Sequence, residues 1–318
     1  MTVVQPDDAR HLYYVMSIAR AIEQKCVELS GLWYPAIGEE AAIVGTHWCA
    51  DPHDVLYPHY RGSLVVQWMR GRTLEDIFRV MLHRHGAASR GRHAPPFDGH
   101  PRGLVMPFAS VMLGPNIAMA AGSGLALKHL GSDAISICAF GDGTSGTGDF
   151  HETLNMAAVL RLPTVFVCQN NQFSISTPAA SALATSSIRD WASGYGIPST
   201  LVDGNDLLAV IGAVRAAVAH TRQSKSPSFV ELSTYRRTGH FAADPARYRD
   251  PEELHRAEVT DPITRLSAHM MQQLGFEPQT LDAVAREAQT HVANAFDTAL
   301  CDRELTADDL DLTGTYAQ

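Results

Sequence analysis

Apolar positions recur at helical spacing near both ends of the chain. In residues 10–29, Leu12, Val15, Ile18 and Ile22 fall on one side of an α-helix. The same spacing predicts further helices over residues 38–48, 74–82, 263–274 and 281–300. We therefore expect a helical N-terminal segment, residues 1–82, and a helical C-terminal segment, residues 251–318.

In the middle of the chain, short apolar runs alternate with longer helical stretches. The runs predict strands over residues 134–140, 164–169, 199–202 and 228–235. The stretches predict helices over residues 117–130, 149–160 and 207–220, the second opened by Asp149 and Glu152 as a capping box. Because such alternation is typical of parallel βαβ units, we expect an α/β fold, with a doubly wound, mainly parallel sheet in three αβα layers over residues 108–250. No repeat or clear linker interrupts the sequence, so residues 1–318 are predicted to form a single domain.

Residues 83–107 differ in character from both neighbours. They contain four Gly, four Pro, four Arg and four His, and Asp98 is their only acid. Long loops inside compact chains are usually functional or disordered. The composition fits a cationic lid over an anionic substrate and a surface insert equally well, so both interpretations stay open.

Composition and charge exclude several classes of protein. The 318 residues are 45% hydrophobic and 19% charged, and the net charge of −9 argues against a nucleic-acid or anionic-membrane partner. Five cysteines form no C-x-x-C pair, which is typical of reduced thiols. Residues 1–10 lack the apolar run of a signal peptide, and no apolar stretch is long enough to cross a bilayer. We therefore expect a cytoplasmic protein.

Polar residues follow two of the predicted strands. Gly141, Asp142 and Gly143 come after the first strand, and Asn170 and Asn171 come after the second. If the two strands are neighbours, Asp142 and Asn171 emerge at the carboxyl edge of the sheet, where open α/β sheets bind ligands. Carboxylate, amide and carbonyl oxygens are the ligands that Mg²⁺ prefers, and glycines let the backbone approach a phosphate closely. The pattern predicts a Mg²⁺-bound diphosphate at this edge.

Each half of this pattern has a simpler interpretation. Gly-Asp-Gly can be a plain turn, and Asn170-Asn171 can be a turn at a strand end. A calcium loop that starts at Asp142 lacks the alternating acids and the terminal Glu of such loops.

The two halves together match a longer motif. Gly-Asp-Gly, residues 144–169, then Asn-Asn resembles the thiamine diphosphate motif, with 26 residues between the two parts. More specifically, the chain resembles the alpha subunit of the thiamine-dependent first component of 2-oxo acid dehydrogenase complexes, a family that includes pyruvate, branched-chain 2-oxo acid and acetoin enzymes. The resemblance spans about residues 14–249. It rests on Gly38-Glu39-Glu40-Ala41, His59-Tyr60-Arg61, Asp149-Phe150-His151, Val202-Asp203-Gly204-Asn205-Asp206, Thr234-Tyr235-Arg236 and Gly239-His240 as well.

The resemblance implies a thiamine diphosphate and Mg²⁺ site. Asp142, Asn171 and the carbonyl of Phe173 would bind Mg²⁺. The residues implied beside the diphosphate are Gly141, Gly143, Thr144, Tyr60, Arg61 and Arg236. His240 matches the active-site histidine of the family, and a group that titrates near neutral pH suits proton transfer.

The segment after the loop would run beneath the cofactor. Ser110 would offer a backbone carbonyl to the aminopyrimidine, and either Met112 or Leu113 would hold the cofactor in its bent form. Leu113-Gly114-Pro115-Asn116 departs from the family and looks more like transketolase, so the resemblance does not choose between Met112 and Leu113.

The resemblance also implies a partner. In this family the glutamate that protonates the aminopyrimidine comes from a beta subunit, and Glu39 and Glu40 match a helix pattern rather than that role. We expect an α₂β₂ heterotetramer that decarboxylates a 2-oxo acid and passes the acyl group to a lipoyl carrier on an acyltransferase. Ser63 and Phe241 depart from pyruvate-type and kinase-regulated members respectively, so the resemblance leaves the 2-oxo acid open.

The sequence also leaves other functions open. A carboligase, like transketolase or an acyloin-forming enzyme, would pass the fragment to a carbonyl acceptor, and the irregular residues 113–116 favour it. A non-catalytic assembly subunit would have lost the chemistry, and the presence of Asp142, Asn171, Arg61 and His240 argues against it. A nicotinamide dehydrogenase on the same sheet is a further alternative, since Gly141, Gly143 and Gly146 after the first predicted strand have the G-x-G-x-x-G spacing and fold alone does not decide function.

Overall fold

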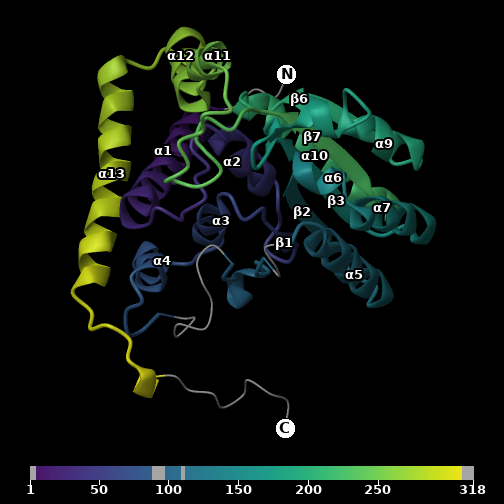
Figure 1. Ribbon diagram of the computed structural model, residues 1–318, viewed down its shortest axis with the longest axis horizontal. Coiled ribbons are helices and arrows are strands. Elements are labelled where there is room, and N and C mark those ends of the chain that lie inside the picture. The colour runs from purple at the N-terminus through teal and green to yellow at the C-terminus, as the bar shows by residue number, and fades with distance from the viewer. Residues whose placement is uncertain (1–4, 88–96, 109–111, 310–318) are drawn as a thin grey trace.

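A parallel sheet lies at the centre of the protein (Figure 1). The computed structural model describes residues 5–87, 97–108 and 112–309. Within these ranges the main sheet has the strand order β1-β2-β3-β7-β6, and every pairing in it is parallel. Its strands are β1 (Val55–Tyr57), β2 (Ser136–Gly141), β3 (Thr164–Asn170), β6 (Ser199–Asp203) and β7 (Ser228–Ser233). A short antiparallel hairpin, β4 (Phe173–Ser174) and β5 (Thr177–Pro178), follows β3.

Both faces of this sheet are buried. On β3, Val165 and Val167 pack into one apolar core, whereas Phe166 and Cys168 pack into a second core on the opposite face. A strand that is buried on both faces has an almost continuous apolar sequence, and this is why β3 could be predicted from its sequence. The predicted α/β fold with a mainly parallel sheet between helical layers is confirmed.

Helices cover the two faces (Figure 1). On the first face lie α1 (Pro6–Leu29), α2 (Glu40–Trp48), α3 (Ser63–Met69), α4 (Leu74–Met81) and α10 (Leu207–Ser224). On the second lie α5 (Pro115–His129), α7 (Gly148–Leu160) and α9 (Ile188–Gly194). The C-terminal helices are α11 (Pro251–Val259), α12 (Pro262–Leu274) and α13 (Pro278–Leu300), and α13 lies along α1 and α4. Shorter turns are α6 (Asp142–Ser145), α8 (Ala179–Ala182), η1 (Pro101–Gly103) and η2 (Ala307–Asp309). No described helix is long and apolar enough to span a membrane.

Two local predictions need correction. The N-terminal segment 1–82 is not only helical, because β1 joins the edge of the sheet through its pairing with β2. A three-residue strand is too short to show a period of two, so its sequence does not reveal it. Asp149 and Glu152 do not form the cap of α7. The helix begins earlier, at Gly148, and the Thr147 hydroxyl accepts the backbone N–H of Phe150.

The loop over residues 83–107 is anchored where the structure describes it, while residues 88–96 lie outside the described ranges. Its one acid, Asp98, is buried and lies 2.8 Å from Nη1 of Arg72. The backbone carbonyl of Asp98 also accepts Nε2 of Gln67, at 2.9 Å. This anchor fixes the neighbouring Phe97 near the carboxyl edge of the sheet, in the candidate site described next.

Candidate functional site at the carboxyl edge of the sheet

Asp142 and Asn171 emerge side by side at the carboxyl edge of the sheet. Gly141, the last residue of β2, lies in register with Gln169 on β3, so each site residue directly follows its strand. Oδ1 of Asp142 accepts the backbone N–H of Asn171 at 3.2 Å. The predicted adjacency of the two strands is therefore confirmed, with each strand ending one residue later than its sequence indicated.

The side chain of Asn171 is held on two sides. Its Nδ2 lies 3.2 Å and 3.3 Å from the two carboxylate oxygens of Glu39, at the start of α2. Its Oδ1 accepts the backbone N–H of Phe173 at 3.3 Å. Asn170 has a separate partner, because its Nδ2 donates to the buried Glu231 on β7 at 2.7 Å. Each asparagine of the pair is thus fixed by its own buried carboxylate.

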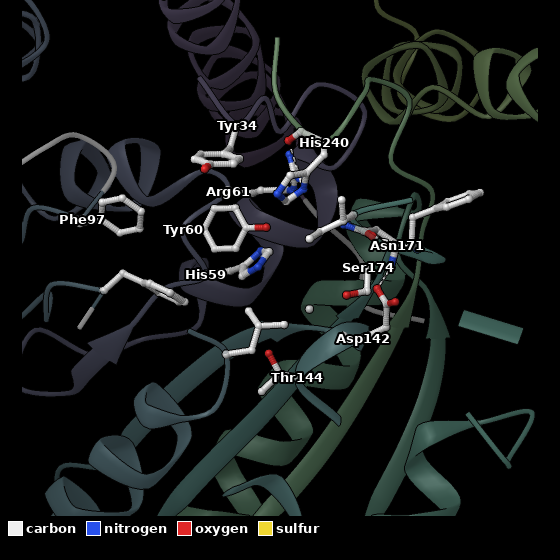
Figure 2. Close-up of a pocket in the computed structure, with 16 residues that line it drawn as sticks. Tyr34, His59, Tyr60, Arg61, Phe97, Asp142, Thr144, Asn171, Ser174 and His240 are labelled. Atoms are coloured by element: carbon white, nitrogen blue, oxygen red, sulfur yellow. Dashed lines mark hydrogen bonds between the residues drawn. The ribbon is translucent and has the colours of Figure 1, made fainter. Parts of the chain in front are cut away.

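A cavity opens beside these residues (Figure 2). One end carries oxygen and nitrogen groups from the strand ends, and the other end is aromatic. Its lining consists of Tyr34, His59, Tyr60, Arg61, Phe97, Phe108, Leu113, Gly141, Asp142, Gly143, Thr144, Asn171, Phe173, Ser174, Ile175 and His240. Most of the predicted site residues therefore meet in one cavity.

Arg61 brings positive charge into this cavity. The side chain is almost fully buried, and its Nη1 donates to the backbone carbonyl of Pro35 at 2.9 Å. Among the described residues, no carboxylate lies within ion-pair distance of its guanidinium. A buried guanidinium without a carboxylate partner suits a bound anion, because burial strengthens its electrostatic attraction.

His240 is oriented by the same arginine. Nη2 of Arg61 donates to Nδ1 of His240 at 3.1 Å and to the backbone carbonyl of His240 at 2.8 Å. Because arginine can only donate, Nδ1 must accept, and the proton of the neutral ring must sit on Nε2. Burial, Arg61 and Arg236 lower the pKa of His240 to about 4. The prediction that it titrates near neutral pH is therefore wrong, and at pH 7 it is a neutral N–H donor.

The loop that carries His240 is tied together by Asp244. Its carboxylate accepts the backbone N–H of His240 and the hydroxyl of Tyr248, each at 2.7 Å. These contacts lower the pKa of Asp244 to about 2, even though burial acts in the opposite direction. The loop therefore presents His240 in a defined position.

Arg236 does not line the cavity. Its buried guanidinium donates to the backbone carbonyl of Phe173 at 3.3 Å, to that of Ile175 and to Tyr248. It thus supports the β4–β5 hairpin, which carries the carbonyl predicted to bind a metal. The structure gives Arg236 a structural place behind the site rather than the direct diphosphate contact that the sequence predicted.

The segment before α5 places Leu113 and Met112 differently. Leu113 lines the cavity, whereas Met112 is 72% exposed and does not. Ser110 lies outside the described residues. Gly143 faces Leu113 closely, since a Cβ there would meet Cδ1 of Leu113 at 3.2 Å and Oγ of Ser174 at 2.5 Å. A side chain at 143 would therefore collide with the wall of the cavity.

The donor set fits a divalent cation and a diphosphate. Burial raises the pKa of Asp142 to about 6, which marks a carboxylate that gains strongly from a nearby cation. Together with an amide oxygen and a backbone carbonyl, it offers the hard oxygen ligands that suit Mg²⁺. The buried cation of Arg61 suits the phosphate charge. The residues present therefore match the predicted cofactor in chemistry.

Several residues of the site were not predicted from the sequence. They are Glu39, Tyr34, His59, Phe97, Phe108, Ser174 and Ile175. His59 carried a signal, because it precedes Tyr60 and Arg61 in the motif His59-Tyr60-Arg61. Burial and Arg61 lower its pKa to about 3, so it is neutral. Glu39 also lies in one of the motifs, Gly38-Glu39-Glu40-Ala41, but it was interpreted as part of a helix pattern. The others come from separate elements, and nothing local in their sequence marks them.

The fold and the cavity together define a parallel α/β protein with a partly polar, partly aromatic cavity at the carboxyl edge of its sheet. The family model described as the dehydrogenase E1 component matches residues 11–308, and the chain belongs to this family.

Named relatives cover most of the chain. This chain is 35% identical to the 3-methyl-2-oxobutanoate dehydrogenase subunit alpha of Mycobacterium tuberculosis over 315 residues. The aligned region covers 97% of this chain and 83% of that protein. The chain is 34% identical over 271 residues to the 2-oxoisovalerate dehydrogenase subunit alpha of Bacillus subtilis, 83% of this chain and 82% of that protein. It is 29% identical over 311 residues to the pyruvate dehydrogenase E1 component subunit alpha of Rhizobium meliloti, 94% of this chain and 87% of that protein.

Proposed function

We propose that this chain is the alpha subunit of a thiamine diphosphate-dependent 2-oxo acid dehydrogenase. The enzyme decarboxylates a 2-oxo acid and passes the acyl group to a lipoyl carrier. The observation that carries the proposal is the meeting of Asp142, Asn171, Arg61 and His240 in one cavity of a dehydrogenase E1 fold. Thiamine diphosphate, when bound, supplies the carbon nucleophile and the electron sink for decarboxylation.

The polar end of the cavity would hold the charged part of the cofactor. Asp142, the Oδ1 of Asn171 and the carbonyl of Phe173 would bind Mg²⁺, and Arg61 with Tyr60 would bind phosphate oxygens. Gly143 lets Ser174 and Leu113 close the wall of the cavity, because a Cβ at this position would collide with both. Leu113 would support the cofactor from below, and Thr144, which also lines the cavity, would lie beside the diphosphate.

His240 would act on the substrate side. Its Nε2–H is available to the cavity, since Nδ1 is taken by Arg61. A neutral donor at this position stabilises negative charge that develops on an oxygen of the substrate. The aromatic end, formed by Tyr34, Phe97 and Phe108, excludes water around the reacting carbon.

The proposal includes a second chain. The relatives are named as alpha subunits, and such a name supports a beta-subunit partner. We expect an α₂β₂ assembly with the cofactor between the chains, in which the beta subunit supplies the glutamate that the aminopyrimidine needs. The lipoyl acyltransferase would be a further, transient partner.

A metal-dependent binding experiment tests this function. The chain is co-expressed with its beta partner, and thiamine diphosphate binding is titrated with and without Mg²⁺ by fluorescence. We expect Asp142→Ala to weaken Mg²⁺-dependent binding at least tenfold, because it removes the charged ligand. The exposed Asp133, which pairs with Lys225 at 2.8 Å, gives the control variant Asp133→Ala.

A dye-reduction assay over a panel of 2-oxo acids completes the test. Turnover of at least one acid by the parent complex, lost in Asp142→Ala and kept in Asp133→Ala, supports the proposal. Equal cofactor binding by Asp142→Ala and the parent would contradict it, and so would a loaded complex that turns over none of the acids.

A further inference from the structure

Glu39 lies in an unusual place for a carboxylate. It directly precedes α2, its side chain is fully buried, and 132 residues separate it from Asn171. Both of its oxygens lie within 3.3 Å of the same atom, Nδ2 of Asn171. The contact ties the helical N-terminal segment to the carboxyl edge of the sheet.

The chemistry of this contact fixes the direction of the carboxamide. The oxygen and nitrogen ends of an asparagine side chain have nearly the same shape, and only the oxygen can bind a cation. A carboxylate can only accept hydrogen bonds, so it holds the nitrogen end toward itself. The oxygen end must then point the other way, where it accepts the backbone N–H of Phe173 at 3.3 Å.

We propose that Glu39 is a positioning residue that holds the oxygen of Asn171 toward the cation of the site. The inference rests on the proposed function, in which Asn171 is a Mg²⁺ ligand. Groups that hydrogen-bond to metal ligands usually orient them, and their loss typically weakens metal binding about 10- to 100-fold.

The variant Glu39→Gln tests the charge of Glu39 and its restriction to accepting hydrogen bonds, while the size of the side chain is kept. Glu39→Gln keeps the shape, but a glutamine can donate as well as accept, so it no longer selects one orientation of Asn171. We expect the Mg²⁺ dissociation constant of the complex, measured by fluorescence at saturating thiamine diphosphate, to rise about 10- to 100-fold. Glu231→Gln is the matched control, because Glu231 is an equally buried carboxylate that holds Asn170 instead. Its Mg²⁺ dissociation constant should stay within about twofold of the parent.

A second background tests whether Glu39 acts through Asn171. In Asn171→Asp both side-chain oxygens can bind the cation, but one of them takes the place of Nδ2 and faces the carboxylate of Glu39. Glu39→Gln removes this repulsion, so it should tighten Mg²⁺ binding in the Asn171→Asp background while it weakens binding in the parent. A residue that only maintains the fold would change binding in the same direction in both. Thermal unfolding of the metal-free complexes checks that each variant is folded.

The results of these experiments distinguish a failure of this inference from a failure of the proposed function. If the parent complex shows no Mg²⁺-dependent binding of thiamine diphosphate, the proposed function is wrong and the inference fails with it. If the parent binds normally and Glu39→Gln binds Mg²⁺ as tightly, or weakens it in both backgrounds, only the role of Glu39 is overturned.

Discussion

Single residues in the cavity owe their chemistry to buried neighbours. His240 is half-buried beside two arginines, and this surrounding, rather than the histidine itself, sets its state at neutral pH. The Arg61 guanidinium is the decisive neighbour because it both lowers the pKa of His240 and occupies its Nδ1. The residue that resembles a proton shuttle in the sequence is, in the structure, a neutral imidazole that accepts from Arg61 at Nδ1 and carries its proton on Nε2.

This donor role gives a prediction for His240. His240→Ala should lower kcat/KM about 100-fold, since it removes one donor to a developing oxyanion. His240→Gln should recover about tenfold of that loss, because the glutamine amide can present an N–H in its place. The measurement is steady-state kinetics of the αβ complex from pH 5.5 to 8. Since the pKa of His240 is about 4, its protonation should contribute no inflection in this range.

A different result would identify a proton-transfer role. If the parent shows a limb near pH 6.5 that both variants lose, and glutamine is no better than alanine, His240 titrates during turnover. The role of Asp244 would then change as well, because its carboxylate, which accepts the backbone N–H of His240, would position a residue that transfers protons.

At the same scale, sequence reasoning found the residues that motifs mark and missed those that the fold brings in. Asp142 and Asn171 were predicted because each follows an apolar strand at a fixed spacing. Glu39 was interpreted as part of a helix start, and its partner lies 132 residues away. Arg236 was placed on the diphosphate because it matched a motif, although its guanidinium turns toward the carbonyl oxygens of the β4–β5 hairpin.

At the scale of elements, one aspartate joins three segments. Oδ1 of Asp261 caps α12 by accepting the backbone N–H groups of Ile263 and Thr264, at 3.1 Å and 3.0 Å. Its Oδ2 pairs with Arg20 on α1, at 2.8 Å, and with Arg237 in the loop that carries His240. Arg20 in turn pairs with Glu40 on α2. The position of the His240 loop therefore depends on the packing of the helical segments at both ends of the chain.

Asparagine at position 261 isolates this link. Asp261→Asn keeps an oxygen for the cap but replaces the charge that both arginines share. We expect the free energy of unfolding to fall by about 2 kcal/mol, since the loss of this carboxylate leaves Arg237 uncompensated, whereas Arg20 keeps Glu40. Hydrogen exchange of the backbone over residues 236–249 should accelerate, because Arg237 loses its anchor. Both are measured on the αβ complex.

Asp206 offers a matched control for this experiment. It caps α10 in the same way, through the backbone N–H groups of Leu208 and Ala209, both at 3.1 Å. Its other oxygen lies 3.5 Å from Arg265, in a pair whose side chains are 42% and 34% exposed. Asp206→Asn should therefore cost less than about 0.5 kcal/mol and leave exchange over residues 236–249 unchanged. Equal effects of the two variants would show that capping, and not the ion pairs, holds the loop.

Elements buried on both faces were the most predictable. The strands β2, β3 and β7 and the long helices follow from apolar runs and helical periodicity, with ends shifted by a few residues. The predicted start of α7 was wrong because the hydroxyl of Thr147, two residues before Asp149, caps the helix. Strand β1 and helix α3 are too short for periodicity to appear, and they hold their conformations through contacts with the rest of the protein.

At the scale of the whole molecule, several buried titratable groups make stability depend on pH. Burial lowers the pKa of His47, on α2, to about 4. Burial raises the pKa of Glu23, on α1, to about 7 and that of Asp142 to about 6. The two kinds of group act in opposite directions. A raised acid pKa stabilises the fold at low pH and loses that contribution as the pH rises through the folded value, whereas a lowered histidine pKa does the reverse.

His47 is the clearest single case because it lies outside the cavity lining. It is buried, and its Nδ1 donates to the backbone carbonyl of Ile43 at 2.8 Å. Between about pH 6.5 and pH 4 the unfolded chain binds a proton at this residue that the folded chain does not, so acid destabilises the fold there. The contribution of His47 is complete above pH 6.5, and its loss toward pH 4 amounts to about 3 kcal/mol at most.

Removing the imidazole should therefore flatten part of the acid limb. We expect the urea midpoints of His47→Leu and the parent to be similar at pH 7. Between pH 7 and pH 4.5, the midpoint of His47→Leu should fall less than that of the parent. Because Glu23 and Asp142 are present in both proteins, the difference between the two curves isolates His47. His53→Leu, at an exposed position, controls for the loss of a histidine as such and should follow the parent curve. If the urea midpoints of His47→Leu and the parent fall in parallel, the prediction is contradicted. The folded protein would then accept a proton on His47, which requires that α2 opens enough to expose this buried residue.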